Sequence, residues 1–160
     1  MPDTYTQIYV HVVFSVKERA HLLPPHHRDE IHKYIGGIIR ARGHTMIAIN
    51  SMPDHVHILL SLHPDAPLSY LVRDIKSAST HFINARSWLH IPFRWQDGYG
   101  AFSHSRAQLP IVARYIREQE HHHARKSFRT EFIDLLKRFE IEFDEHYLLG
   151  WEEEAVDVEG

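Results

Sequence analysis

Two histidines separated by one residue stand in the segment MPDHVHILL, at His55 and His57. Alternate side chains of a β-strand share a face, so both imidazoles point one way while Val56, Ile58 and Leu60 enter the core. The pair is about 6.6 Å apart along a strand, and neutral imidazoles at that spacing can bend onto one divalent ion. The alternative is that the histidines merely occupy a sheet face. Two ligands leave a metal site incomplete, so a third must come from elsewhere.

A second candidate set lies in ARYIREQEHHH, where Tyr115 and Gln119 are four residues apart. On a helix this spacing makes them neighbours on one face. A tyrosine beside a carbonyl-bearing ligand indicates a nucleophile held next to a metal. The alternative is an ordinary amphipathic stripe that includes Val112 and Ile116. The histidines at 121–123 could themselves bind metal, but they point to three faces of a helix, which is typical of solvated surface.

The elements that must position these residues are predicted from periodicity and turn signals. They are a strand over 7–16, a helix from Pro24 to Gly43, strands over 45–52 and 55–62 joined by a turn at Pro53-Asp54, a helix from Pro67, a short strand over 101–105, and helices over about 109–123 and 128–139.

The order β-α-β-β-α-β, followed by helices, is that of the ferredoxin-like fold, an α+β architecture with a split β-α-β-β-α-β antiparallel sheet. Strands one and three then lie in the middle of the sheet. Strand one alternates, with Val10, Val12 and Phe14 on one face and His11 and Ser15 on the other, which predicts a half-buried strand. We expect two helices on one sheet face and an open second face.

Length and composition restrict the class of protein. A chain of 160 residues is long enough for one domain with its own core, here predicted over 1–150, with an acidic flexible tail over 151–160. The absence of cysteine excludes disulfides, thiolate nucleophiles and zinc–thiolate sites. No apolar run approaches the length of about 20 residues that a membrane helix needs, and the N-terminus lacks a signal-peptide layout. We expect a cytoplasmic protein.

The formal net charge of −3 hides an asymmetry. Residues 1–126 carry 15 Lys and Arg against 10 Asp and Glu, whereas residues 127–160 carry 3 against 11. A mildly basic body permits a polyanionic partner without requiring one. Any function on nucleic acid must therefore be argued from the site.

Three segments in this order, MPDHVHILL, WQDGYGAFSHS and YIREQEHH, carry a family resemblance. The chain resembles the single-tyrosine transposases of small bacterial insertion sequences, the TnpA-type, IS200-like members of the HUH endonucleases. The resemblance spans nearly the whole chain. It implies a ferredoxin-like fold, binding of single-stranded DNA hairpins at transposon ends, and cutting and rejoining of single strands.

The resemblance also implies roles for individual residues. Carried over by motif position, His55, His57 and Gln119 would hold Mg²⁺ or Mn²⁺, and Tyr115 would be the nucleophile that forms a 5′-phosphotyrosine bond. Independently of the resemblance, Asp54 could orient a ligand histidine; the alternative is a structural role as a turn residue before the strand. The family acts as a homodimer in which the tyrosine helix of one subunit commonly completes the histidine pair of the other, and the sequence leaves that exchange open.

A set of basic and aromatic residues is predicted to contact DNA, because phosphates attract cations and unpaired bases stack on aromatic rings. They are Lys17, Arg19, Arg73, Lys76, Arg94, Trp95 and Tyr99.

Two other classes of protein compete with the transposase. A histidine-triad nucleotide hydrolase requires His-x-His-x-His, and the third position here is Leu59. A non-catalytic nucleic-acid binder on the same fold would use the open sheet face as a stacking platform. Such a platform needs aromatic residues in the middle of strands one and three, where only Tyr9 fits.

Overall fold

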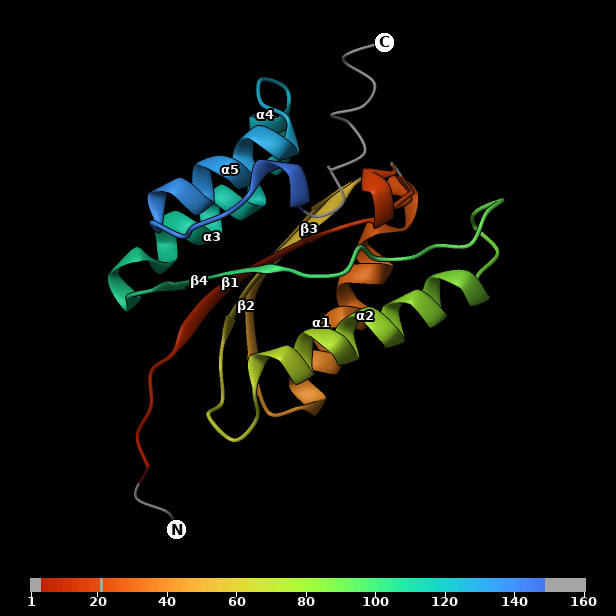
Figure 1. Ribbon diagram of the computed structural model, residues 1–160. Helices are drawn as coiled ribbons and strands as arrows, with labels where there is room; N and C mark the ends of the chain where they lie inside the picture. The colour runs from red at the N-terminus through yellow and green to blue at the C-terminus, as the bar shows by residue number, and fades with distance from the viewer. Residues whose placement is uncertain (1–3, 21, 149–160) are drawn as a thin grey trace.

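The computed structural model describes residues 4–20 and 22–148 (Figure 1). The predicted acidic tail at 151–160 lies outside the described residues. So does the side chain of Arg19.

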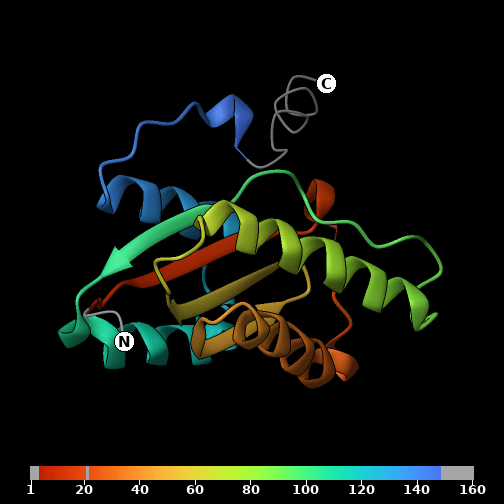
Figure 2. The ribbon, with the colours of Figure 1, turned by 90° about the horizontal axis from the view of Figure 1, so that it is seen from below.

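A four-stranded antiparallel sheet forms the centre of the fold (Figures 1 and 2). Its strands are β1 (Tyr9–Ser15), β2 (Thr45–Met52), β3 (His55–Ser61) and β4 (Gly100–His104). Their order is β2-β3-β1-β4, which confirms the predicted α+β arrangement with strands one and three in the middle. The register places Ser15 opposite His55 and Val13 opposite His57.

Two helices cover one face of this sheet, α1 (Arg28–Ala41) and α2 (Leu68–Ala85). Each has an apolar stripe at the helical period, and these stripes pack on the apolar side chains that β1 and β3 direct to this face. Gly43 ends α1 with a φ of +86°, a left-handed conformation that glycine adopts without strain. This layer agrees with the prediction.

The second face of the sheet is covered, not open as predicted. Figure 1 shows α3 (Leu109–Arg117), α4 (Gln119–His123) and α5 (Phe128–Arg138) on this side. Residues His11, Val13 and Ser15 of β1 are consequently buried, so the prediction of a half-buried strand is wrong. The C-terminal helices are amphipathic themselves and bury their apolar stripes on the only sheet face left.

The helix predicted over 109–123 is interrupted. Glu118 has φ −95° and ψ 25°, and it separates α3 from α4. At this point the side-chain amide of Asn50 on β2 donates to the carbonyl oxygens of Ile116 at 3.0 Å and Arg117 at 3.2 Å. Carbonyl groups at a helix end need such partners, so β2 holds the end of α3 directly.

Short 3₁₀ segments lie between and after the longer elements. The segments are η1 (Lys17–Arg19), η2 (Pro25–His27), η3 (Arg106–Gln108) and η4 (Glu145–Tyr147). An ion pair between Arg28 and Glu120 ties the start of α1 to α4. None of the described helices has the length and apolar character needed to cross a membrane.

The contact between β4 and α5 leads to a stability prediction. A Cβ on Gly100 would lie 2.7 Å from the ring of Phe132 and 3.1 Å from that of Phe102. We expect Gly100→Ala to lower the free energy of unfolding by about 1–3 kcal/mol, since packed rings cannot give way cheaply. The matched control is Gly37→Ala on α1, where a Cβ meets nothing within 4 Å and should stabilise by about 0.5–1 kcal/mol. Urea denaturation of both variants measures the two changes, and an equal effect would contradict the packing argument.

Candidate active site

The histidine pair lies in the middle of the sheet, on the face covered by α3, α4 and α5. His55 and His57 are fully buried on β3 and share a face, as strand alternation predicts. Val56 and Ile58 point to the opposite core. The prediction that both imidazoles point the same way is confirmed by this geometry.

Each imidazole of the pair is fixed through its Nδ1 atom. His55 Nδ1 lies 2.6 Å from Asp54 Oδ1, which places Asp54 where it can orient a ligand histidine. His57 Nδ1 lies 2.8 Å from Nε2 of His11 on β1. With both Nδ1 atoms engaged, the Nε2 atoms of the pair face the space beneath α4 and α5.

Gln119 reaches this space from the first position of α4. It is fully buried, and its Oε1 lies 3.3 Å from His55 Nε2. Its Nε2 donates to Glu131 Oε2 at 3.2 Å. The structure therefore brings Gln119 to the histidine pair, although a helix break now separates it from Tyr115.

Two further residues join the cluster that the sequence did not predict. Glu131 Oε1 lies 2.9 Å from His57 Nε2 and 3.2 Å from His123 Nε2. His123 Nε2 also lies 2.9 Å from Gln119 Oε1. The interpretation of the 121–123 histidines as solvated surface is thus wrong for His123, because α4 turns this side chain under α5.

A signal for Glu131 was present in the sequence. Glu131 falls on the same helical face as Phe128, Phe132 and Leu135, at a position where an apolar residue is expected. A carboxylate on the apolar side of an amphipathic helix is rarely buried without a partner. That mismatch marks a candidate functional residue.

The cluster has the composition of a cation site. One ligand atom from each of His55, His57, His123 and Glu131 lies within 4.8 Å of the others, and the carbonyl oxygen of Gln119 is adjacent. Imidazole nitrogens and carboxylate or amide oxygens are ligands for divalent metals. These residues fit a divalent cation, and the donor set alone does not select which one.

Electrostatics hold Glu131 in its ionised form. Burial alone would raise the pKa of Glu131, but the charge and hydrogen bond of His57 and the hydrogen bonds of His123 and Tyr115 outweigh it and hold the pKa well below its usual range. Burial lowers the pKa of His57 despite the opposing effect of Glu131. For His123 burial is outweighed by the hydrogen bond and charge of Glu131, which raise its pKa.

Tyr115 meets this cluster through its hydroxyl. The phenol donates a hydrogen bond to Glu131 Oε2, and its ring stands edge-on to His57 at 5.9 Å. The ring of His122 lies against it at 4.7 Å. Burial, followed by the charge of Glu131, raises the pKa of Tyr115 far above its usual value. One chain therefore places its tyrosine beside its own histidine pair.

The tyrosine is accessible from outside. A cavity of about 370 Å³ opens beside it, with Tyr115 and Glu131 in its walls. Basic side chains contribute much of the remaining lining, and these are His121, His122, Arg125, Lys126 and Arg138. An anion that enters this cavity reaches the phenol.

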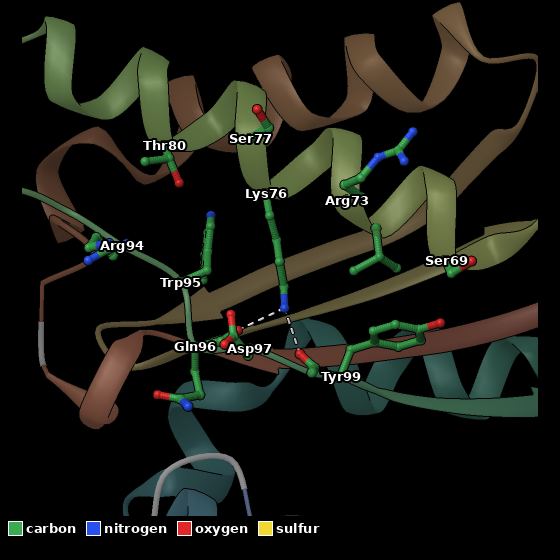
Figure 3. A pocket seen from close by; sticks show the side chains of 12 residues that line it. Ser69, Arg73, Lys76, Ser77, Thr80, Arg94, Trp95, Gln96, Asp97 and Tyr99 are labelled. Atoms are coloured by element: carbon green, nitrogen blue, oxygen red, sulfur yellow. Dashed lines mark hydrogen bonds between the residues drawn. The ribbon is translucent and has the colours of Figure 1, made fainter.

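Most of the predicted DNA contacts gather in a second cavity, of about 510 Å³, between α2 and the segment 94–99 (Figure 3). Its lining includes Arg73, Lys76, Arg94, Trp95 and Tyr99. Lys17 lies next to this wall, since its backbone N–H donates to the carbonyl of Arg94 at 2.9 Å.

Two of these residues have structural roles that the sequence did not indicate. The ring of Trp95 packs edge-on against Phe14 in the core, and its indole N–H donates to Ser79 at 2.9 Å, so the predicted stacking of its ring on a base is wrong for this conformation. The ammonium of Lys76 donates to the carbonyls of Gln96 at 2.8 Å and Gly98 at 2.6 Å (Figure 3). Burial lowers its pKa.

Comparison with known proteins identifies the family of the chain. A family model described as "Transposase IS200 like" matches residues 4–119. The chain belongs to the IS200-like transposase family, which confirms the resemblance. It is 33% identical over 118 residues to the ISDra2 transposase TnpA of Deinococcus radiodurans, a match that covers 71% of this chain and 84% of that protein. His123 and Glu131 lie beyond the segment that the family model matches.

Two solved structures share the fold. A Deinococcus radiodurans protein described as a transposase superposes with a TM-score of 0.61 and 22% identity, over 74% of this chain and 95% of that one. A REP-associated tyrosine transposase bound to a REP hairpin gives a TM-score of 0.57 and 20% identity, over 77% and 73% of the two chains.

The contact between Tyr115 and Glu131 predicts a coupled titration. A carboxylate disfavours formation of a phenolate beside it, so removal of its charge should lower the pKa of Tyr115. We expect Glu131→Gln to lower that pKa by about 1–3 units. Phenolate ultraviolet absorbance against pH measures it, with the matching Tyr115→Phe protein subtracted to isolate this one tyrosine. An unchanged titration would show that Glu131 does not control the phenol.

Proposed function

We propose that the protein cleaves and rejoins single-stranded DNA at hairpin-bearing transposon ends, with Tyr115 as the nucleophile and Mg²⁺ or Mn²⁺ as the cofactor. The observation that carries the proposal is the position of one carboxylate. Glu131 accepts from the Tyr115 hydroxyl through one oxygen and meets His57 through the other. Nucleophile and candidate cation site are thereby joined through a single side chain.

The chemistry follows from these residue types. The Tyr115 oxygen attacks phosphorus and the bond to the 3′ oxygen breaks, which leaves a 5′-phosphotyrosine bond and a free 3′-hydroxyl. The hydrogen bond to Glu131 orients the Tyr115 hydroxyl, and its proton passes to solvent in the adjoining cavity as the new bond forms, while the departing 3′ oxygen takes up a proton. Since one phosphodiester replaces another, the 3′-hydroxyl can reverse the step and rejoin the strand without a nucleotide cofactor.

The cation would be held by His55 and His57, with Gln119 as the third ligand that the family resemblance implies. The geometry adds Glu131 and His123 to the candidates. A bound divalent cation supplies Lewis-acid stabilisation of the charge that develops on the phosphate. The raised pKa of Tyr115 would fall with a positive charge at the cluster, because that charge would offset the charge of Glu131.

Two surfaces would receive the DNA. The basic cavity beside Tyr115 suits the phosphate that is cut. Arg73 and Arg94 in the second cavity, with Lys17 beside it, suit the backbone of the hairpin. Tyr99 is only half-buried and is the stacking candidate that remains after Trp95.

We further propose that residues 1–150 act as one transposase domain and that the protein is a homodimer, as the resemblance implies. The contact of Tyr115 with its own chain's Glu131 supports a site that one protomer completes by itself. The rival sheet-platform binder is disfavoured because α3, α4 and α5 cover the face it would use. The histidine-triad rival still lacks its third histidine, since Leu59 is a buried core residue.

The covalent step is tested by Tyr115→Phe. With labelled hairpin single strands and Mg²⁺, the wild-type protein should form a protein–DNA adduct that survives SDS. Tyr115→Phe should form none, yet bind the hairpin with an affinity within about threefold of wild type, because no phosphate contact is lost. Tyr147→Phe is the matched control and changes an exposed tyrosine outside the site. An adduct that persists in Tyr115→Phe would overturn the assignment.

The second cavity is tested by Arg73→Gln and Arg94→Gln. Each change should weaken hairpin binding by about three- to tenfold at low salt and reduce the slope of log affinity against log salt by about 1. Adduct formation at saturating DNA should not change, because the tyrosine site is untouched. Arg40→Gln, an exposed arginine of α1 outside the cavity, is the control. Equal salt slopes in all four proteins would exclude a phosphate contact at this cavity.

A further inference from the structure

A third histidine of the sheet contacts the site without belonging to the metal-ligand candidates. His11 on β1 lies opposite Leu59 of β3 and Phe102 of β4, and it is almost fully buried. Its Nε2 lies 2.8 Å from His57 Nδ1, and the two rings lie side by side at 5.0 Å with 23° between their planes. A buried polar side chain at this position calls for an explanation.

We propose that His11 is a positioning residue that acts through His57, as a neutral hydrogen-bond acceptor that fixes the tautomer of His57 required for cation binding. The inference rests on the proposed function. Only an imidazole with its proton on Nδ1 has a free lone pair on Nε2, and His57 Nε2 is the atom that faces the cluster. His11 Nε2 is the acceptor within reach of that Nδ1 proton.

This role needs the neutral form of His11, and burial disfavours a charged imidazole at this almost fully buried position. A charged His11 would donate from both nitrogens and could not accept from His57. The two ligand histidines are therefore held differently, His55 by the Asp54 carboxylate and His57 by a neutral ring that adds no charge.

When His11 Nε2 accepts, its own proton must stand on Nδ1. The ring of His104 lies 6.2 Å from the ring of His11. His104 Nδ1 lies 3.3 Å from Gln108 Oε1, and His104 Nε2 is buried without a hydrogen-bond partner among the described residues.

The contact between His57 and Glu131 also allows the alternative arrangement. There His57 Nε2 can donate to Glu131 at 2.9 Å, with Nδ1 as the acceptor. Cation binding requires both rings to move their protons to Nδ1, which a His11–His57 pair can do without any change in net charge. A residue that cannot accept at this position leaves His57 in the wrong tautomer and weakens the site.

The experiment compares His11→Leu with His11→Gln. Leucine fills the space without an acceptor, whereas glutamine carries an amide oxygen to about the position of Nε2. Mn²⁺ affinity of the full-length, DNA-free protein, measured by calorimetry and electron paramagnetic resonance, should fall about 10–100-fold in His11→Leu. In His11→Gln it should stay within about threefold of wild type. Rescue by glutamine is not expected of a residue that only fills space.

Controls separate this role from loss of structure. His44→Leu removes another buried imidazole, one that accepts from the backbone of His63 outside the cluster, and should leave Mn²⁺ affinity unchanged. Thermal melts verify folding of each variant. If His11→Leu does not fold, His11→Asn replaces it, because its amide is too short to reach the Nε2 position and it should weaken Mn²⁺ binding similarly.

The outcomes are distinct. Mn²⁺ affinity that is unchanged in His11→Leu, or equally reduced in His11→Gln, overturns the positioning role. His57→Ala with wild-type Mn²⁺ affinity would instead overturn the metal ligands of the proposed function, and the role of His11 with them. Loss of affinity in His57→Ala together with the leucine and glutamine results above supports both.

Discussion

The site depends on one buried negative charge. Glu131 is buried on the side of α5 that faces the sheet, where an unpaired carboxylate would lower the stability of the fold by several kcal/mol. Its oxygens are satisfied by His57, His123, Gln119 and Tyr115, which come from three separate elements. Because all of these partners are needed at once, α3, α4 and α5 must pack on the sheet in one arrangement. The carboxylate therefore organises the same residues that the proposed chemistry uses.

The two faces of the sheet have different roles. One carries an apolar core under α1 and α2, and this core fixes the strand register that aims His55 and His57 together. The other carries the polar cluster and the late helices. The two are connected at the end of β1, where the backbone of Val16 donates to the carbonyl of Asp54 at 2.8 Å, next to the aspartate side chain that holds His55. A rigid core thus positions a polar site, as precise chemistry requires.

Local patterns predicted much of this arrangement. The alternation in β1 and β3 and the turn at Pro53-Asp54 are short-range signals, and the strand order follows from their sequence. The motif positions of Tyr115 and Gln119 led to the correct region of space. The same local patterns did not predict where the apolar stripes of the C-terminal helices pack. The prediction of an open sheet face was wrong. Periodicity indicates that α5 has an apolar side, but it does not indicate which surface that side covers.

By itself, the sequence determined the family, the α+β order of elements and the face on which His55 and His57 lie, because these depend on residue type and on spacing along one strand or helix. Only the tertiary structure decided that His123 and Glu131 join the pair, that His11 contacts His57, and that Trp95 is a core residue. Those relations join positions far apart in the sequence, such as His57 and Glu131, which are 74 residues apart. Contacts at such separations depend on how amphipathic helices pack on a sheet, and local spacing carries no record of that packing.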